Sequence, residues 1–159
     1  MSKTSGKNGR FGNQFIRNIL LSLLAERHNL QAVYYNHELM SELGIDLYCG
    51  KNKFTNTRIL NKDNYFNIYN KKSLDYNLDP NKCFFQTKEL CNFLYNYLIS
   101  LDVMYKISQK NPFNNRYNNN NDIFIHLRLN GVSGLNPGAK YYIDIIDSLE
   151  YNKIYLSTD

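Results

Sequence analysis

The sequence of 159 residues has no tryptophan and only three cysteines. Cys49, Cys83 and Cys91 form neither an even disulfide set nor a Cys-x-x-Cys pair, so we expect reduced thiols rather than a disulfide framework. The 25 asparagines include no Asn-x-Ser/Thr sequon, which suits a chain that does not enter the secretory pathway. Together these absences favour a cytoplasmic location.

Long apolar runs are also absent. The longest nearly apolar stretch, residues 19–25, is far too short to cross a bilayer, and residues 1–8 lack the apolar region of a signal peptide. We therefore expect no transmembrane segment. With 43% hydrophobic and 21% charged residues, the chain suits one ordinary domain or two small lobes.

A formal net charge of +5 could indicate a polyanionic partner or a phosphorylated substrate. The lysines of the middle segment are scattered among asparagines, at Lys51, Lys53, Lys62, Lys71 and Lys72. Such scattering favours a solvated basic surface over a polyanion-binding patch, although both interpretations stay open. We expect no nucleic-acid partner.

The first lobe is expected over residues 1–110. After a glycine turn, apolar residues at helical spacing predict a helix over residues 13–28, and a short strand is expected over residues 32–35. Residues 36–82 predict short strands and long surface loops. A second apolar stripe predicts one helix over residues 87–107, with these side chains in the core: Leu90, Phe93, Leu94, Tyr97, Leu98, Leu101 and Tyr105.

An asparagine-rich segment, residues 111–121, contains one proline and seven asparagines and predicts a linker. Beyond it, the pattern predicts a strand over residues 122–129, a helix over residues 140–150 and a strand over residues 153–157. This order is typical of a βαβ unit with parallel strands. Residues 122–159 are therefore expected to begin a second lobe.

Gly9 and Gly12 form a glycine turn in front of the first helix, and Asn13 and Gln14 follow it. Such a turn brings bare backbone close to a ligand, and a helix N-terminus offers unpaired N–H groups to an anion. In that interpretation Gly12 is needed for its backbone conformation or for close approach. A turn that merely starts a helix, with an asparagine cap, explains the same residues.

His126 and Arg128 are two residues apart in the strand expected over residues 122–129, so they project from the same face. The carboxyl ends of parallel strands are where α/β folds bind ligands. An arginine there suits a phosphate, because its planar fork can bind two oxygens at once. A solvated edge-strand arginine beside a hydrogen-bonded histidine is the alternative.

Several segments together resemble the α-1,2-fucosyltransferase family. Gly9-Arg10-Phe11-Gly12-Asn13-Gln14-Phe15 resembles that family's Gly-Gly-Leu-Gly-Asn-Gln-Met/Leu-Phe signature, and Ile125-His126-Leu127-Arg128 resembles its His-x-Arg-Arg-Gly-Asp motif. Phe84-Phe85-Gln86 is similar to an aromatic-aromatic-Gln segment before the long helix. Tyr141-Tyr142 and the end of the chain are similar to the family's Tyr-Tyr helix and its strand ending in Ser-Asp-Asp.

The resemblance implies a GT-B type glycosyltransferase with Rossmann-type parallel sheets and flanking helices. It implies inverting transfer of L-fucose from GDP-fucose to a galactoside-type acceptor, with no cofactor and no obligatory metal. Arg128 would bind the diphosphate, His126 would lie beside it at the sugar or phosphate, and the Gly9–Gln14 turn would face the cleft. His28 and His37 have no partners at metal-ligand spacing, in agreement with a protein without a metal site.

The chain departs from the family pattern in ways that bear on activity. Leu129, Asn130 and Gly131 replace the second Arg, the Gly and the Asp of the motif, so no general base is assigned. A strand before the glycine turn is not expected, because residues 1–8 are polar. The second lobe is expected to be incomplete, and a second chain could complete it. The alternatives are a catalytically inactive fragment that binds a nucleotide or partner, and a basic binding module.

Overall fold

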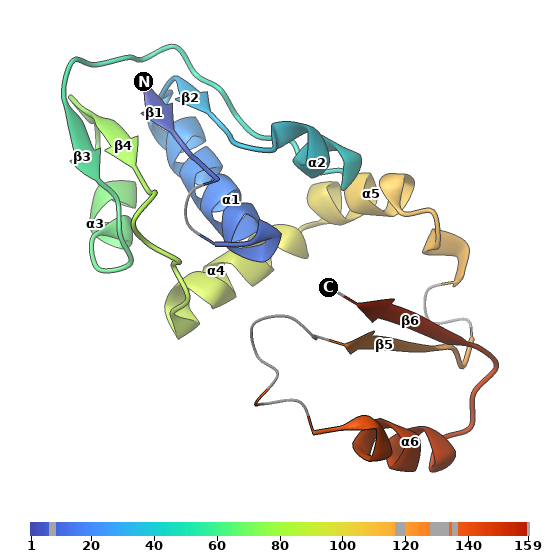
Figure 1. Ribbon diagram of the computed structural model, residues 1–159. Helices are drawn as coiled ribbons and strands as arrows, with labels where there is room; N and C mark the ends of the chain where they lie inside the picture. The colour runs from blue at the N-terminus through green and yellow to red at the C-terminus, as the bar shows by residue number, and fades with distance from the viewer. Residues whose placement is uncertain (7–8, 117–119, 128–133, 135–136, 159) are drawn as a thin grey trace. The chain divides into compact units, whose positions relative to one another are not determined.

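The computed structural model describes residues 1–6, 9–116, 120–127, 134 and 137–158 (Figure 1). The chain divides into two compact units, Met1–Asn111 and Pro112–Asp159, and the division falls at the start of the asparagine-rich segment. Both units combine helices with parallel strand pairs, so the expected mixed α/β class is confirmed.

The elements of the first unit are β1 (Ser2–Lys3), α1 (Phe11–His28), β2 (Ala32–Val33), α2 (His37–Glu42), β3 (Thr57–Ile59), α3 (Tyr65–Tyr69), β4 (Asn77–Asp79), α4 (Lys88–Leu98) and α5 (Leu101–Lys110). The second unit contains a 3-10 turn (Asn114–Arg116), β5 (Ile123–Leu127), α6 (Ala139–Asp147) and β6 (Ile154–Thr158).

The strand β1 corrects the expectation that no strand precedes the glycine turn. It pairs in parallel with β2, although its residues are polar. Ser2 and Thr4 are 0% and 2% exposed. The Ser2 hydroxyl accepts a hydrogen bond from the Leu78 N–H at 2.9 Å, and the Thr4 hydroxyl accepts one from the Tyr35 N–H at 2.7 Å. These side-chain bonds link β1 to β4 and to the end of β2, so buried polar side chains here substitute for apolar ones.

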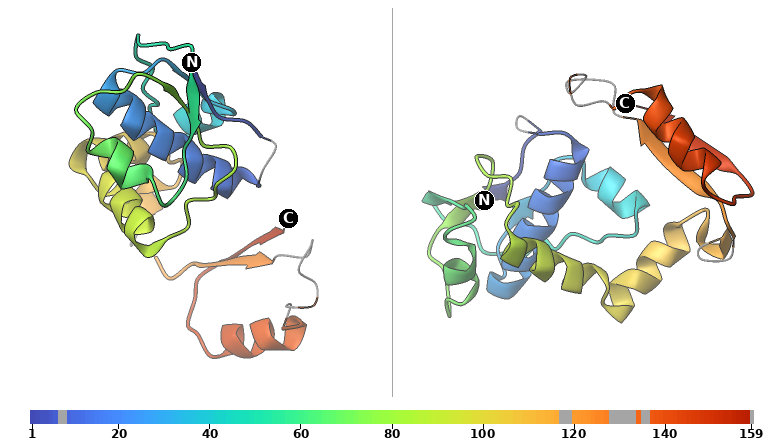
Figure 2. Two further views of the ribbon diagram at one scale, coloured as in Figure 1. Left: turned by 90° about the vertical axis from the view of Figure 1, so that its left-hand side faces the viewer. Right: turned by 90° about the horizontal axis from the view of Figure 1, so that it is seen from below.

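The helix α1 lies at the centre of the first unit, where it contacts β2, α3 and α4 (Figures 1 and 2). Its two apolar faces are buried in two clusters. One cluster joins Leu20, Leu24 and neighbouring side chains to Tyr65, and the other joins Ile19 to Met40. The expected helix over residues 13–28 is therefore confirmed, and it begins two residues earlier.

The single helix expected over residues 87–107 is wrong, because α4 ends at Leu98 and α5 begins at Leu101. Ser100 has extended backbone angles between them, with φ −61° and ψ 146°. Its hydroxyl donates to the Tyr97 carbonyl oxygen at 2.7 Å, a local side-chain bond that competes with continuous helix. The stripe is consequently core only in α4, since Leu101 is 89% exposed and Tyr105 is 66% exposed.

Residues 36–82 contain two short helices, α2 and α3, besides the expected short strands and loops. Asparagine side chains build the start of α3. The Asn61 side chain accepts from the N–H groups of Asp63 and Asn64, and the Asn64 side chain accepts from the Asn61 N–H. Apolar periodicity does not detect such turns, because amide side chains form them.

The second unit confirms the expected strand, helix, strand order and the parallel pairing of β5 with β6. Phe124 pairs with Tyr155 and His126 pairs with Ser157 along the register. None of the residues of α6 is buried. Arg116 anchors the start of this unit by donating to the Tyr155 hydroxyl and to the Asp122 carboxylate.

Within the part of the chain that the structure describes, none of the helices has both the length and the apolar character needed to cross a membrane.

His28, the last residue of α1, makes stability depend on pH. It is 8% exposed, its Nε2 bonds the Ile68 carbonyl oxygen at 3.0 Å, and its Nδ1 is buried without a partner. Burial lowers the pKa of His28 below its ordinary value of 6.5, against the smaller raising effect of the Ile68 bond. The folded state therefore favours the neutral ring more strongly than the unfolded state does.

The free energy of unfolding should fall as pH drops below 6.5, because unfolded His28 then binds a proton that the folded ring does not. His28→Gln should remove much of this dependence, whereas His37→Gln, at an exposed position, should leave it unchanged. Urea unfolding at pH 5, 6, 7 and 8 measures the effect. If the free energy of unfolding changed equally with pH in the wild type and in His28→Gln, His28 would not be the source of the pH dependence.

Candidate functional site

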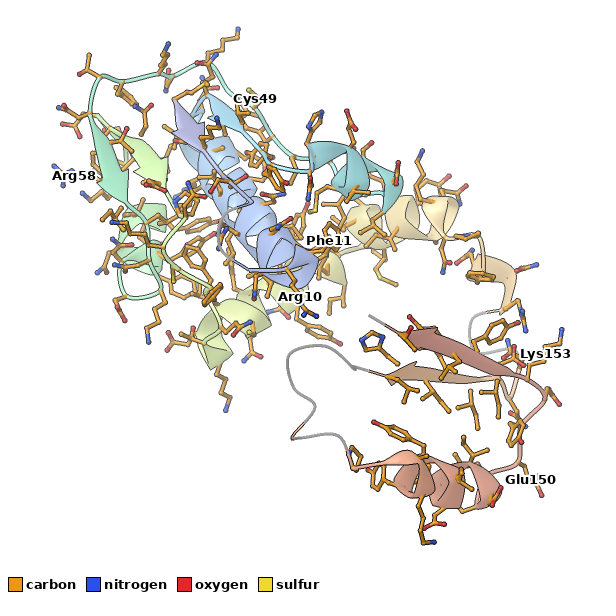
Figure 3. The ribbon with its side chains drawn as sticks, viewed as in Figure 1. Arg10, Phe11, Cys49, Arg58, Glu150 and Lys153 are labelled. Carbon is orange, nitrogen blue, oxygen red and sulfur yellow. The ribbon has the colours of Figure 1, made fainter. Side chains whose placement is uncertain are left out.

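The glycine turn lies where β1 and β2 end, so it occupies the carboxyl edge of a parallel strand pair. Arg10 and Phe11 stand at the start of α1 (Figure 3). The first turn of α1 has no acidic residue, so nothing within it opposes the partial positive charge of a helix N-terminus. This edge is the position at which α/β folds bind ligands.

Of the two glycines in the turn, Gly9 is the one that the backbone requires. Gly9 has φ +91°, and a Cβ there would lie 2.6 Å from the Asn13 side chain. Gly12 lies inside α1 without a positive φ, and a Cβ there would meet no atom within 4 Å. The expectation that Gly12 is needed for its backbone conformation is therefore wrong. The space around it is open.

Asn13 connects two of the sequence segments that carry the family resemblance. Its Oδ1 accepts a hydrogen bond from Gln86 Nε2 at 2.9 Å, across 73 positions of sequence. Gln86 follows Phe85, which is buried and has φ +58°. The structure thus brings the glycine turn and the Phe84–Gln86 segment together at one edge.

Gln14 is buried at 8% exposure and fastens the turn from inside. Its Nε2 donates to the Gly9 carbonyl oxygen at 3.1 Å, and its Oε1 accepts from Asn36 Nδ2 at 2.8 Å. Asn36 follows β2 in a left-handed conformation, with φ 56°. Gln14 therefore joins the two loops of this edge, so its side chain is committed to protein groups.

Arg17 is a buried residue of this edge that belongs to none of the sequence motifs. Its side chain is 0% exposed, Nη1 donates to the Ser5 carbonyl oxygen at 3.1 Å, and Nε and Nη2 both lie 3.4 Å from the Cys83 carbonyl oxygen. Burial lowers the pKa of Arg17, and Cys83 and Asp79 act in the opposite direction. An arginine one turn after Gln14 was the only sequence signal, and it is a weak one.

Of the pair expected in the second unit, His126 lies in β5 with its side chain exposed. Arg128 lies outside the described residues. The register places His126 beside Ser157 of β6, one position before the carboxyl end of β5. His126 is thus available to a ligand at that end of the parallel pair.

Two cavities in the first unit were not anticipated from the sequence. One, of about 390 Å³, is lined by residues of β2 and α2 together with Asp46 and Cys49. The other, of about 430 Å³, is lined by Glu26, Asp46, Tyr97 and Lys106 among others. The Lys106 ammonium lies 2.6 Å from the Asp46 carboxylate, and both are solvated. Burial raises the pKa of Tyr97. Neither cavity is lined by the residues of the glycine turn.

A metal site is not formed by the described residues, among which no three His, Cys, Asp or Glu side chains gather suitably. Comparison with known proteins found no matching family model, no similar curated protein and no similar solved structure.

Proposed function

We propose that the chain is an α-1,2-fucosyltransferase-like glycosyltransferase of GT-B type, acting on GDP-fucose and a galactoside-type glycan acceptor. The observation that carries the proposal is the 2.9 Å bond between Asn13 and Gln86. It joins two segments that resemble separate family motifs at the carboxyl edge of a parallel strand pair. A chance likeness of scattered short motifs gives no reason for such a contact.

The second unit supports the same proposal through its topology. A parallel strand, a helix and a second parallel strand, with His126 near the carboxyl end of β5, form one βαβ unit of the kind from which nucleotide-binding sheets are built. In the proposed role Arg128 binds the diphosphate two positions further along. As GDP leaves, negative charge grows on the β-phosphate, and a fixed guanidinium stabilises that charge in the transition state.

Arg128→Ala should weaken GDP binding by about 10-fold to 100-fold, because a charge-assisted contact to phosphate is lost. The GDP affinity of Arg128→Lys should lie between those of the wild type and Arg128→Ala, since lysine keeps the positive charge but lacks the planar guanidinium that binds two oxygens. Isothermal titration calorimetry of the full chain with GDP measures both. Lys140→Ala, an exposed cation of the same unit that pairs with Asp144, is the matched control and should bind like the wild type.

Two results would overturn the donor assignment: no GDP binding by the wild type at millimolar concentration, or binding by both Arg128 variants within about twofold of it. The acceptor step is tested separately, by following GDP release from GDP-fucose with and without a galactoside. Binding of GDP without acceptor-dependent release would instead support the alternative of an inactive nucleotide-binding module.

A further inference from the structure

Two cations, 13 positions apart in the sequence, converge on one buried tyrosine just before β4. The Arg58 guanidinium carbon lies 4.3 Å from the centroid of the Tyr76 ring, and Lys71 Nζ lies 5.5 Å from it. Lys71 Nζ also bonds the Tyr76 hydroxyl at 3.3 Å. Tyr76 is 3% exposed, whereas both cations are exposed. The ring therefore holds two solvent-facing positive charges near each other.

Asn77, the neighbour of Tyr76, holds the segment that carries a third cation. The Asn77 side chain donates to the Phe54 carbonyl oxygen at 2.7 Å and accepts from the Phe54 N–H at 3.1 Å. Lys53, the exposed neighbour of Phe54, is thereby carried on a segment that is fastened next to Tyr76. Arg58 and Lys71, which are 13 positions apart in the sequence, thus lie close together on the ring of Tyr76.

The charge of this segment is only partly compensated. Residues 51–79, all of which the structure describes, carry six exposed Lys and Arg residues and three acidic residues, Asp63, Asp75 and Asp79. None of these six cations forms an ion pair with a carboxylate in the described chain. A segment with more cations than carboxylates, two of its cations held close together on one ring, favours a partner with several anionic groups.

We propose that this surface, defined by Lys53, Arg58, Lys71 and Lys72, binds a sulfated polysaccharide. Exposed amide side chains lie among the cations in sequence, at Asn52, Asn56, Asn67 and Asn70. Amides donate to and accept from hydroxyl groups, while the cations bind sulfate oxygens. Alternating hydroxyl and sulfate groups are what such a polysaccharide presents. The inference is independent of the proposed donor site.

Single-stranded nucleic acid fits the surface less well. Single-stranded nucleic acid is bound through exposed aromatic platforms on which bases stack. The Tyr76 ring is buried, and between residues 51 and 83, a fully described segment, no aromatic side chain is strongly exposed. The surface therefore offers charge and amides without a platform for bases.

The test measures the affinity of the full chain for heparin, used as the sulfated probe, over a series of salt concentrations. The wild type should bind with a steep salt dependence, as counterion release requires. Arg58→Gln with Lys71→Gln should weaken binding at least about tenfold and reduce the slope of log affinity against log salt by roughly one to two. Arg58→Lys with Lys71→Arg keeps both charges and should stay within about threefold of the wild type.

Lys88→Gln with Lys110→Gln removes the same charge from exposed positions on α4 and α5 and is the matched control. It should retain binding within about twofold. The proposal is overturned if the wild type does not bind heparin at low salt, or if the control loses as much affinity as the Arg58 and Lys71 pair. Tighter binding to duplex or single-stranded DNA than to heparin at equal salt would also overturn it.

Discussion

Arg17→Ala should destabilise the first unit by about 3 kcal/mol or more, which is a large part of the stability of a domain of this size. Arg17 is fully buried, and it donates to the carbonyl oxygens of Ser5 and Cys83. Ser5 follows β1, and Cys83 lies in the segment that leads to α4. Alanine would leave these carbonyls without their donors and would open a cavity beside α1.

Arg27→Ala is the matched control for this prediction. Arg27 lies on the same helix but is exposed, with its guanidinium carbon 5.6 Å from the centroid of the Tyr69 ring. Its loss should cost only about 0.5 to 1 kcal/mol. Urea unfolding followed by far-UV circular dichroism compares the two variants. Equal stability of Arg17→Ala and Arg27→Ala would mean that Arg17 does not connect these segments as inferred.

Strong apolar periodicity explains what could be predicted from the sequence. The helix α1 and the β5, α6, β6 order followed from apolar side chains at helical or alternating spacing, and both are present. These signals are local, because a few adjacent turns of helix or one strand contain the whole pattern. The boundaries moved by at most three residues, as helix and strand ends commonly do.

Side-chain hydrogen bonds explain what could not be predicted. The strand β1 depends on the Ser2 and Thr4 hydroxyls, whose partners Leu78 and Tyr35 lie far along the chain. The break between α4 and α5 depends on Ser100. Neither the strand nor the helix break changes the apolar pattern. A prediction from that pattern therefore misses β1 and expects one continuous helix in place of α4 and α5.

The candidate site also has a part that could be predicted from the sequence and a part that could not. The glycine turn could be placed at a helix start from its sequence, but its partners could not, because Asn13 and Gln86 are 73 positions apart. Gln14 bonds Gly9 and Asn36, and Asn36 lies 22 positions away in sequence, so this second partner could not be predicted either. The sequence led us to expect that Gly12 is the glycine needed for the backbone conformation, whereas the structure shows a positive φ at Gly9.

Gly44→Ala should destabilise the first unit by about 3 kcal/mol, whereas Gly12→Ala should stabilise it by up to about 1 kcal/mol. Gly44 has φ +78° immediately after α2, and a Cβ there would lie 2.4 Å from the Lys106 carbonyl oxygen of α5. The Gly44 N–H donates to the Ser41 carbonyl oxygen at 3.0 Å, and the Ile45 N–H donates to the Met40 carbonyl oxygen at 2.9 Å. These two bonds form the Schellman motif that ends α2.

A side chain at Gly44 would therefore oppose two features at once, the left-handed backbone of the motif and the close approach of α5. The approaching atoms are backbone, so no rotamer change can relieve the contact. At Gly12 the same added methyl group meets open space within a helix, and it mainly reduces the conformational freedom of the unfolded chain. Urea unfolding of the two variants should give shifts of opposite sign. A Gly44→Ala protein as stable as Gly12→Ala would show that α5 can move away from the end of α2 at little cost.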